Sequence, residues 1–240
     1  MTSKIFCAID TVDLDKAAQL AGQVAPHLGG IKLGMEFFYA QGQDGICHVL
    51  EAVPKETAFF LDLKLHDIPN TVFGAVKAIA PLNPDFLTIH AGGGQDMIRA
   101  GVDAAKTHTP GTTILAVTVL THMTAQDLQE TGATGDTKTQ VLRLAETALA
   151  AGAGGLICSP LEIAALRQRF GTAPVLMVPG IRPADKSVTK DDQSRVMSPE
   201  QAFLAGADHL VIGRPITQAQ DPAAAAAKIA TAISSCTAAA

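Results

Sequence analysis

A-F-F-L-D-L-K-L-H-D-I-P-N, residues 58–70, is the stretch that decides the fold, because it reads as a buried strand that ends in charges. Successive side chains of a β-strand point to opposite faces. One face of this strand is therefore apolar, and the other carries Asp62, Lys64 and His66 toward its end. Charged side chains are rarely buried without a partner, so their presence at the carboxyl end of a core strand calls for a functional explanation.

A helix is predicted to follow this strand at once. Pro69 cannot donate a hydrogen bond to a strand ladder and is expected to stop the strand, and Asn70 is a favourable N-cap for a helix over residues 71–80. In the alternation of strand side chains, Asp67 falls on the face opposite to that of Asp62 and Lys64. A regular strand would therefore turn Asp67 away from them, toward a loop or a neighbouring chain.

The alternative is a solvated ion pair on an exposed edge strand, which is the usual explanation of an isolated D-x-K-x-x-D pattern. Three observations oppose it here. The flanking run is too apolar for an exposed edge, a helix follows directly, and other predicted strands along the chain also end in charges. We therefore favour a buried strand whose carboxyl end has a function.

Length and composition indicate one globular domain. The chain has 240 residues, of which 48% are hydrophobic and 17% are charged. This length matches the usual size of a (β/α)8 barrel, about 250 residues. A chain with so much apolar and so little charged material can bury a large core, which excludes a disordered protein. A division into two domains is the alternative that length alone leaves open.

Charge, aromatic content and hydropathy exclude several classes of partner. The formal net charge is -5, and the chain has no Trp and one Tyr, which argues against a nucleic-acid surface. No apolar run is long enough for a membrane span and the sequence enters a strand without a signal peptide, so a cytoplasmic location is expected. The cysteines form no C-x-x-C pair and are expected to be reduced thiols, with no disulfide framework and no zinc site; they are Cys7, Cys47, Cys158 and Cys236.

The rest of the chain repeats the pattern of a strand followed by a helix. Eight strands are predicted, over residues 4–10, 30–34, 59–66, 84–90, 113–121, 155–159, 173–182 and 207–214. This alternation indicates an α/β fold, a closed (β/α)8 TIM barrel that forms a single domain over residues 1–240. The Ala-rich tail from about residue 234 is expected to fray. A doubly wound open sheet is the alternative, but no G-x-G-x-x-G follows the first strand.

Charged residues gather at the ends of the first four predicted strands. In a parallel barrel the carboxyl ends of all strands meet at one mouth, so these side chains would converge there. A single His or Asp at a strand end is more often a loop anchor than a ligand, and it is their convergence that predicts a site. The converging residues are Asp10, Lys32, Asp62, Lys64 and His90.

A phosphate site is predicted beside these charges. Barrels commonly bind phosphate with the loops that follow strands seven and eight, where this chain has P-G-I-R at 179–182 and I-G-R-P at 212–215. Glycine permits close approach of the backbone, and Arg182 and Arg214 can each offer a two-pronged donor to phosphate oxygens. The alternative is a pair of glycine turns with solvated arginines.

The sequence strongly resembles the orotidine 5′-phosphate decarboxylase family in its bacterial form, nearly from end to end. The resemblance rests on the A-I-D start, I-K-L-G around Lys32, the signature F-L-D-L-K-L-H-D-I-P-N-T, T-V-L-T at 118–121, P-G-I-R, D-Q-S-R-V-M-S-P at 192–199 and V-I-G-R-P at 211–215. It implies a (β/α)8 homodimer, with no metal ion and no organic cofactor. The implied reaction converts orotidine 5′-monophosphate to UMP and CO2 in pyrimidine synthesis.

The resemblance also implies a role for each matching residue. Lys64 would protonate C6 of the pyrimidine, and Lys32, Asp62 and Asp67 would complete an alternating charge array, with Asp67 given by the partner subunit. Asp10 and Lys32 would hold ribose hydroxyls and Thr121 would lie beside the substrate. The phosphate would be bound by Arg182, Gln193, Gly213 and Arg214, and the remaining signature residues that would contact substrate are His66, Ile68, Pro69, Asn70 and Thr71.

One departure from the family pattern concerns the phosphate loop. The segment between Arg182 and Gln193 is longer than the common bacterial spacing, which affects the assignment of Gln193. The polar segment 183–194 has almost no apolar residue to bury, and we expect it to act as a lid that closes over bound phosphate.

Two other functions compete with this interpretation. A sugar-phosphate decarboxylase or lyase of the same superfamily would share the barrel and a D-x-K-x-x-D pattern but would need Mg2+, and it would carry small residues where this chain has H-D-I-P-N. A non-catalytic nucleotide-binding barrel would bind UMP without releasing CO2. Nothing in the sequence favours it, because every charged position is intact.

Overall fold

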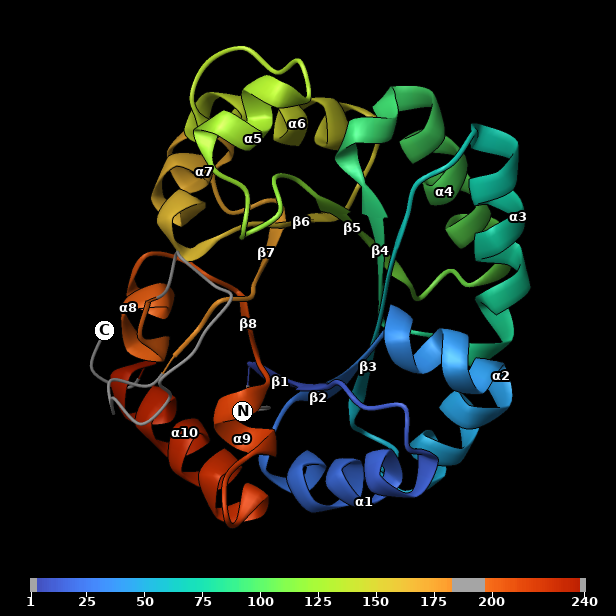
Figure 1. The fold of residues 1–240 in the computed structure, drawn as a ribbon, viewed down its shortest axis with the longest axis vertical. Helices are drawn as coiled ribbons and strands as arrows, with labels where there is room; N and C mark the ends of the chain where they lie inside the picture. Colours follow the sequence, from blue (N-terminus) through green and yellow to red (C-terminus); the bar gives the residue numbers. More distant parts are fainter. Residues whose placement is uncertain (1–3, 183–196, 238–240) are drawn as a thin grey trace.

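In the computed structural model, which describes residues 4–182 and 197–237, the chain forms a closed barrel of parallel strands in the order β1 to β8 (Figure 1). The strands are β1 Ile5–Ile9, β2 Gly30–Gly34, β3 Ala58–Leu65, β4 Phe86–His90, β5 Thr113–Val117, β6 Gly155–Ile157, β7 Val175–Val178 and β8 His209–Ile212. Closure is completed by pairing of β1 with β8, in which Phe6 lies opposite Val211. The predicted α/β fold and (β/α)8 barrel are confirmed, and the open sheet is excluded.

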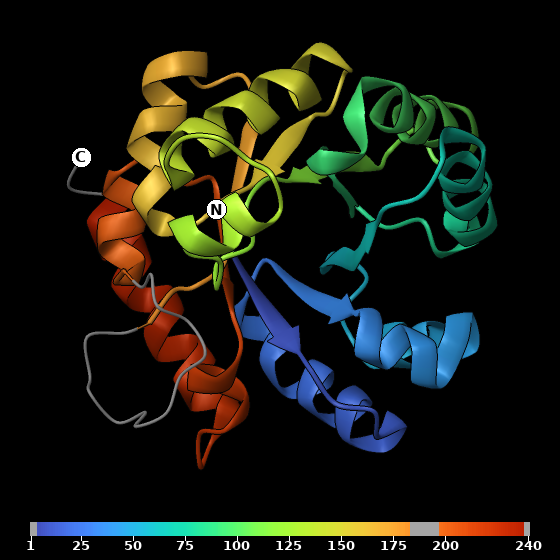
Figure 2. The ribbon, with the colours of Figure 1, turned by 45° about the horizontal axis from the view of Figure 1, so that its top comes forward.

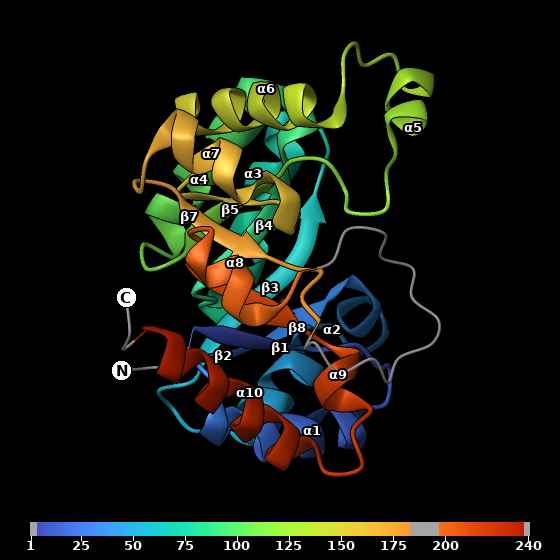
Figure 3. The same ribbon diagram turned by 90° about the vertical axis from the view of Figure 1, so that its left-hand side faces the viewer.

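Helices surround the strands on the outside of the barrel, as the tilted view also shows (Figure 2). They are α1 Leu14–Val24, α2 Met35–Glu51, α3 Pro69–Ile79, α4 Gly94–His108, α5 Ala125–Glu130, α6 Thr137–Ala150, α7 Ile163–Phe170, α8 Pro199–Leu204, α9 Arg214–Thr217 and α10 Pro222–Thr237. Short 3-10 helices occupy Ala25–His27, Ala80–Leu82, Ala91–Gly93 and Pro160–Glu162. In the side view, β1 starts and α10 ends on the side away from α5 (Figure 3).

Several predicted boundaries were wrong in detail. The helix after the central strand begins one residue before Asn70, with Ile68 in the N-cap position and Pro69 in its first turn, because proline is well suited to a place where no amide hydrogen is needed. The fifth strand ends at Val117, so Thr121 lies in a turn beyond it. Pro215 was expected in the first turn of the last helix, but it lies in the first turn of the short α9, which begins at Arg214, and α10 is a separate helix that continues to Thr237.

Two hydrophobic layers explain why the barrel is stable and where its charges can lie. Alternate strand residues such as Ile5, Cys7 and Ile9 are fully buried in the layer between strands and helices. The opposite face contributes a second cluster that includes Phe6, Phe60 and Met177 and fills the barrel interior. The interior is therefore packed, and Lys32 and Asp62, which belong to the same face, line the cavity at the mouth.

Some predictions fall outside the described residues. Gln193 and the proposed lid over residues 183–194 are among them, and so is the end of the Ala-rich tail beyond Thr237. Within the ranges that the structure describes, no helix is both long enough and apolar enough to cross a bilayer.

Candidate active site

A cavity of about 480 Å³ opens at the carboxyl ends of the strands. Its size falls in the range of small-molecule sites, about 300–1,000 Å³. Its floor is apolar and includes Ala8, Phe60 and Val211 of the interior cluster. The predicted site residues that line it are Asp10, Lys32, Asp62, Lys64, Thr121, Arg182, Gly213 and Arg214, together with Gly180.

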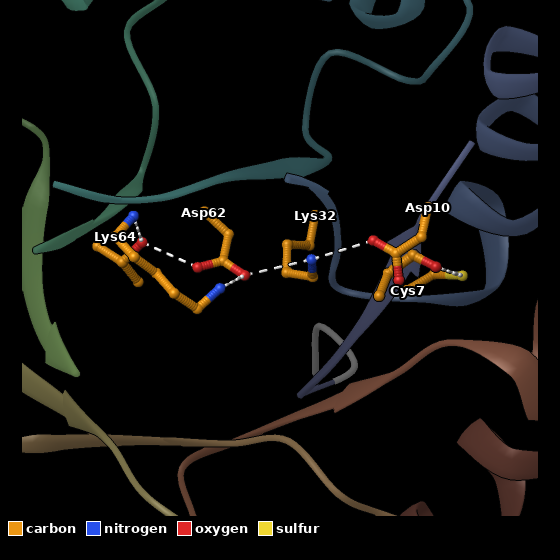
Figure 4. A network of polar contacts seen from close by, with 7 residues as sticks. Cys7, Asp10, Lys32, Asp62 and Lys64 are labelled. Atoms are coloured by element: carbon orange, nitrogen blue, oxygen red, sulfur yellow. Dashed lines mark hydrogen bonds and ion pairs between the residues drawn. The ribbon is translucent and has the colours of Figure 1, made fainter. Parts of the chain in front are cut away.

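Four charged side chains from three neighbouring strands form a continuous row in this cavity (Figure 4). The Nζ atom of Lys64 lies 2.8 Å from Oδ2 of Asp62, and the Nζ atom of Lys32 lies 3.3 Å from the same oxygen. Lys32 also lies 3.4 Å from Oδ1 of Asp10. The row thus alternates in sign, because β1, β2 and β3 are adjacent and each brings its charge to the same level of the barrel.

Burial makes this row electrostatically strong. Lys32 is 9% exposed and Asp62 is 8% exposed, whereas the side chain of Asp10 is 60% exposed. Burial alone would raise the pKa of Asp62, but the ammonium groups of Lys32 and Lys64 outweigh it and lower that pKa to about 2. Burial would lower the pKa of Lys32, and the carboxylates of Asp62 and Asp10 reverse this and raise it. Asp62 is therefore an anion, and Lys32 a cation, at neutral pH.

The strand that carries two of these charges is irregular at Lys64. Leu61 pairs with Leu87 and Leu65 pairs with Ile89, so three residues of β3 face the single residue Thr88 of β4. Lys64 has a φ of 49°, in the left-handed region that side-chain-bearing residues rarely adopt. Its backbone N–H donates to Oγ1 of Thr88 at 2.9 Å, which replaces a ladder hydrogen bond.

Asp67 and its neighbours do not line the cavity of their own chain. Residues 66–71, which include the predicted substrate contacts His66, Ile68, Pro69, Asn70 and Thr71, are all exposed. The carboxylate of Asp67 accepts from the backbone N–H of Ile68 at 2.6 Å. The expectation that Asp67 turns away from the charge row within its own chain therefore agrees with the structure.

His90, predicted to converge with the charges, also lies outside the cavity lining. Its ring stacks on that of His66, with centroids 5.2 Å apart and planes inclined by 21°. Burial lowers the pKa of His90, and His66 and Lys64 lower it further. At neutral pH the His90 ring is therefore uncharged, and it supports the segment that follows Lys64.

The predicted phosphate residues lie where β7 and β8 end, next to the Asp10 end of the charge row, because β8 pairs with β1. Gly180, Arg182, Gly213 and Arg214 line the cavity, as do Pro179 and Gln218. Gly180 has a φ of 80°, a conformation that glycine adopts without strain. The backbone N–H of Arg182 donates to the carbonyl of Met197 at 3.0 Å, so these two residues are held together.

Sequence reasoning missed several lining residues. Val119, Leu120 and Ile157 carry no charge, and only their positions within a strand or soon after one could have indicated them. Gln218 follows α9, and no signal in the sequence indicated it. Cys158 also lines the cavity, but burial, and then the carboxylate of Glu162, raise the pKa of its thiol. A protonated thiol is a poor nucleophile, so Cys158 contributes shape rather than covalent chemistry.

Comparisons with known proteins agree with this geometry. A family model described as "Orotidine 5'-phosphate decarboxylase / HUMPS family" matches residues 3–229. An orotidine 5′-phosphate decarboxylase of Thermobifida fusca is 49% identical over 232 residues, which cover 96% of this chain and 95% of that protein. One from Gluconobacter oxydans is 47% identical over 231 residues, 95% of each chain. The crystal structure of orotidine 5′-phosphate decarboxylase from Lactobacillus acidophilus has a TM-score of 0.84 and 36% identity, and covers 96% of this chain and 99% of that one.

Proposed function

Because the chain belongs to the orotidine 5′-phosphate decarboxylase family, we propose that its cavity converts orotidine 5′-monophosphate to UMP and CO2 in pyrimidine biosynthesis. The observation that carries the assignment of roles is the alternating row from Asp10 to Lys64, which ends in an ammonium 2.8 Å from a buried carboxylate. This row offers a proton, a repelling charge and hydroxyl-binding groups within one cavity. The proposed chemistry uses these side chains alone, with no organic cofactor and no metal ion.

The reaction breaks the bond between C6 of the pyrimidine and its carboxylate. CO2 leaves, and the electron pair stays on C6 in an orbital that the ring cannot delocalise. The barrier in water is therefore very high, and enzymes lower such barriers by roughly 8–23 kcal/mol. Most of this lowering must be electrostatic, because no covalent intermediate is required.

Lys64 is the proposed proton donor. Its ammonium stabilises the negative charge that develops at C6 and then gives C6 a proton, after which the amine recovers one from water. The geometry supports this role, because Lys64 lines the cavity while its Nζ is held by Asp62. A fixed ammonium needs no reorganisation as the charge develops.

Asp62 is proposed to face the carboxylate of the substrate. A buried anion with a pKa of about 2 stays charged at neutral pH and repels the substrate carboxylate, but not the neutral CO2 that it becomes. Lys32 holds Asp62 in place on its other side and, with Asp10, is positioned to contact ribose hydroxyls. Thr121, in the turn after β5, is proposed to lie beside the bound nucleotide.

The phosphate of the substrate is proposed to bind where β7 and β8 end, to Arg182, Gly213 and Arg214, with Gln193 as a further contact. Two arginines on one wall support an anion site, because each can donate two parallel hydrogen bonds to phosphate oxygens. Binding energy from the phosphate can then be used to fix the pyrimidine against Lys64. Closure of the segment 183–194 over the phosphate belongs to the same proposal.

A homodimer is proposed to complete the charge array. Asp67 lies in an exposed segment next to Ile68, which is 66% exposed, so this segment is accessible to a second chain. The partner's Asp67 would then extend the row beyond Lys64. The remaining segment residues His66, Pro69, Asn70 and Thr71 would approach the partner's substrate in the same way.

The rival function is a Mg2+-dependent sugar-phosphate decarboxylase or lyase. Within residues 4–182 and 197–237, no group of three or more His, Cys, Asp or Glu side chains is arranged to hold a metal ion.

The cytoplasmic location expected from the sequence stays a prediction.

One assay separates these functions. Loss of orotidine 5′-monophosphate absorbance should proceed at the same rate before and after exhaustive chelation of divalent cations. An activity that disappears on chelation and returns with Mg2+ would favour the rival enzyme. Binding of UMP with no turnover of orotidine 5′-monophosphate would indicate a non-catalytic nucleotide-binding barrel.

A further inference from the structure

Thr88 lies on β4 at the place where the register of β3 and β4 shifts. It is the single β4 residue opposite residues 62 to 64, and it is 0% exposed. Its hydroxyl donates to Oδ1 of Asp62 at 2.9 Å and accepts from the backbone N–H of Lys64 at 2.9 Å. One small side chain thus touches both residues proposed to act on the substrate.

The two hydrogen bonds of Thr88 are compatible and specific. A hydroxyl has one hydrogen to donate and lone pairs to accept, so both bonds can form at once and together fix its orientation. Both ammonium groups contact Oδ2 of Asp62, at 2.8 Å and 3.3 Å. The bond to Oδ1 is therefore what sets the plane of the carboxylate, since Oδ2 alone would let it rotate.

The second hydrogen bond supports the backbone of Lys64. A left-handed conformation is unfavourable for lysine and persists only where its surroundings impose it. The register shift deprives the Lys64 amide of a regular ladder partner, and a buried amide without a partner is destabilising. The hydroxyl of Thr88 supplies that partner, and so it holds the point from which the Lys64 side chain leaves the strand.

We propose that Thr88 is a positioning residue, which sets the Asp62 carboxylate and the Lys64 backbone in the register that catalysis needs. Thr88 is absent from the cavity lining, so it acts through these two residues rather than on the substrate. A small displacement of a proton donor lowers the rate of the chemical step much more than it lowers the affinity for the substrate. This inference rests on the proposed function, because it concerns the same two residues.

The test compares Thr88→Val with Thr88→Ser. Valine keeps the shape and removes the hydroxyl, whereas serine keeps the hydroxyl. With orotidine 5′-monophosphate, Thr88→Val should lower kcat about tenfold to a hundredfold while KM changes less than about threefold, and Thr88→Ser should stay within about threefold of the parent. Exchange of the Lys64 amide hydrogen, followed by NMR, should accelerate in Thr88→Val and not in Thr88→Ser.

Three results would overturn the inference: a kcat for Thr88→Val within twofold of the parent, an equal loss in both variants, or a Lys64 amide that exchanges at the parental rate in Thr88→Val. If Thr88→Val does not fold, Thr88→Cys, whose thiol is a weak donor and acceptor, takes its place against Thr88→Ser. A parent enzyme that does not decarboxylate orotidine 5′-monophosphate would contradict the proposed function itself, whereas a normal parent with an unaffected valine variant would contradict only the role of Thr88.

Discussion

The ionised state of Asp62 in the free protein can be tested through stability. The proposed repulsion of the substrate carboxylate requires Asp62 to be an anion, and the two ammonium groups that hold it predict this. We therefore expect Asp62→Asn to lose a stabilisation that the parent owes to that charge. The signature of this loss is its dependence on pH, which no loss of packing would produce.

The magnitude follows from the shift of the Asp62 pKa. Folding lowers it from 3.8 to about 2, because Lys32 and Lys64 outweigh the effect of burial. A lowered pKa means that the stabilisation is present above the unfolded-state value and is lost as the pH falls through the folded-state value. The full contribution is about 2 kcal/mol at neutral pH, and linkage gives a loss of about 1 kcal/mol by pH 3.

The assay is urea unfolding of the parent and of Asp62→Asn at pH 6, 5, 4 and 3, at one protein concentration. The difference in free energy of unfolding between the two proteins should shrink by about 1 kcal/mol across this series. Asp44→Asn, on the exposed side of α2, controls for the removal of one negative charge. A difference that stays constant from pH 6 to pH 3 would refute the reasoning, because Asp62 would then not be held as an anion by its neighbours.

Three further predictions test other parts of the site, and a fourth tests His209, whose ring packs against Phe6 and Phe86. Lys64→Ala and Lys64→Gly should both abolish turnover. In urea unfolding, the glycine variant should be more stable than the alanine variant by about 1 kcal/mol, since glycine tolerates a φ of 49°. Equal stability of the two variants would argue against backbone strain at Lys64. Mixed Lys64→Ala and Asp67→Ala chains should recover activity through one intact site per heterodimer, and heterodimers without activity would place Asp67 in its own subunit's site. Arg214→Ala should lower kcat/KM for orotidine 5′-monophosphate about a hundredfold or more but have little effect on the nucleoside without phosphate, and equal losses on both would indicate a structural role. Burial lowers the pKa of His209, whose Nδ1 has no hydrogen-bond partner among the described residues. The folded state therefore loses stability as the pH falls below about 6.5. His209→Leu should raise Tm more at pH 5 than at pH 8, and the same change in Tm at both pH values would contradict this.

The position of the charges could be predicted from sequence because it depends on local rules. Asp10 directly follows β1, Lys32 is the middle residue of β2, and Asp62 lies in the carboxyl-terminal half of β3. The apolar residues of these strands repeat with a period of two, and closure of a parallel barrel brings these parts of the strands together. The cavity lining confirms that these three share one site. Local rules also identified the glycine and arginine turns after β7 and β8.

Other features depend on pairing between strands and were not predictable. The sequence of residues 58–70 does not predict the register shift between β3 and β4, because the register depends on both strands. The burial of Thr88 against Asp62 depends on that shift and was missed for the same reason. The predicted start of α3 was wrong because Pro69 can end a strand, but proline is equally suited to the first turn of a helix.

The irregularity at Lys64 leaves the parity of the strand intact, which explains why the alternation argument correctly placed Asp62 and Lys64 on one face of an irregular strand, although His66, beyond the end of β3, does not line the cavity. Between the pairs Leu61 with Leu87 and Leu65 with Ile89, β3 has three residues and β4 has one, so β3 contains two extra residues. An even insertion restores each later side chain to its original face, whereas a single extra residue would have reversed them all. Leu65 is therefore on the same face as Leu61, and Lys64 still points to the mouth with Asp62. An insertion of this kind relocates the backbone of the proposed proton donor without disturbing the apolar layer on which the barrel depends.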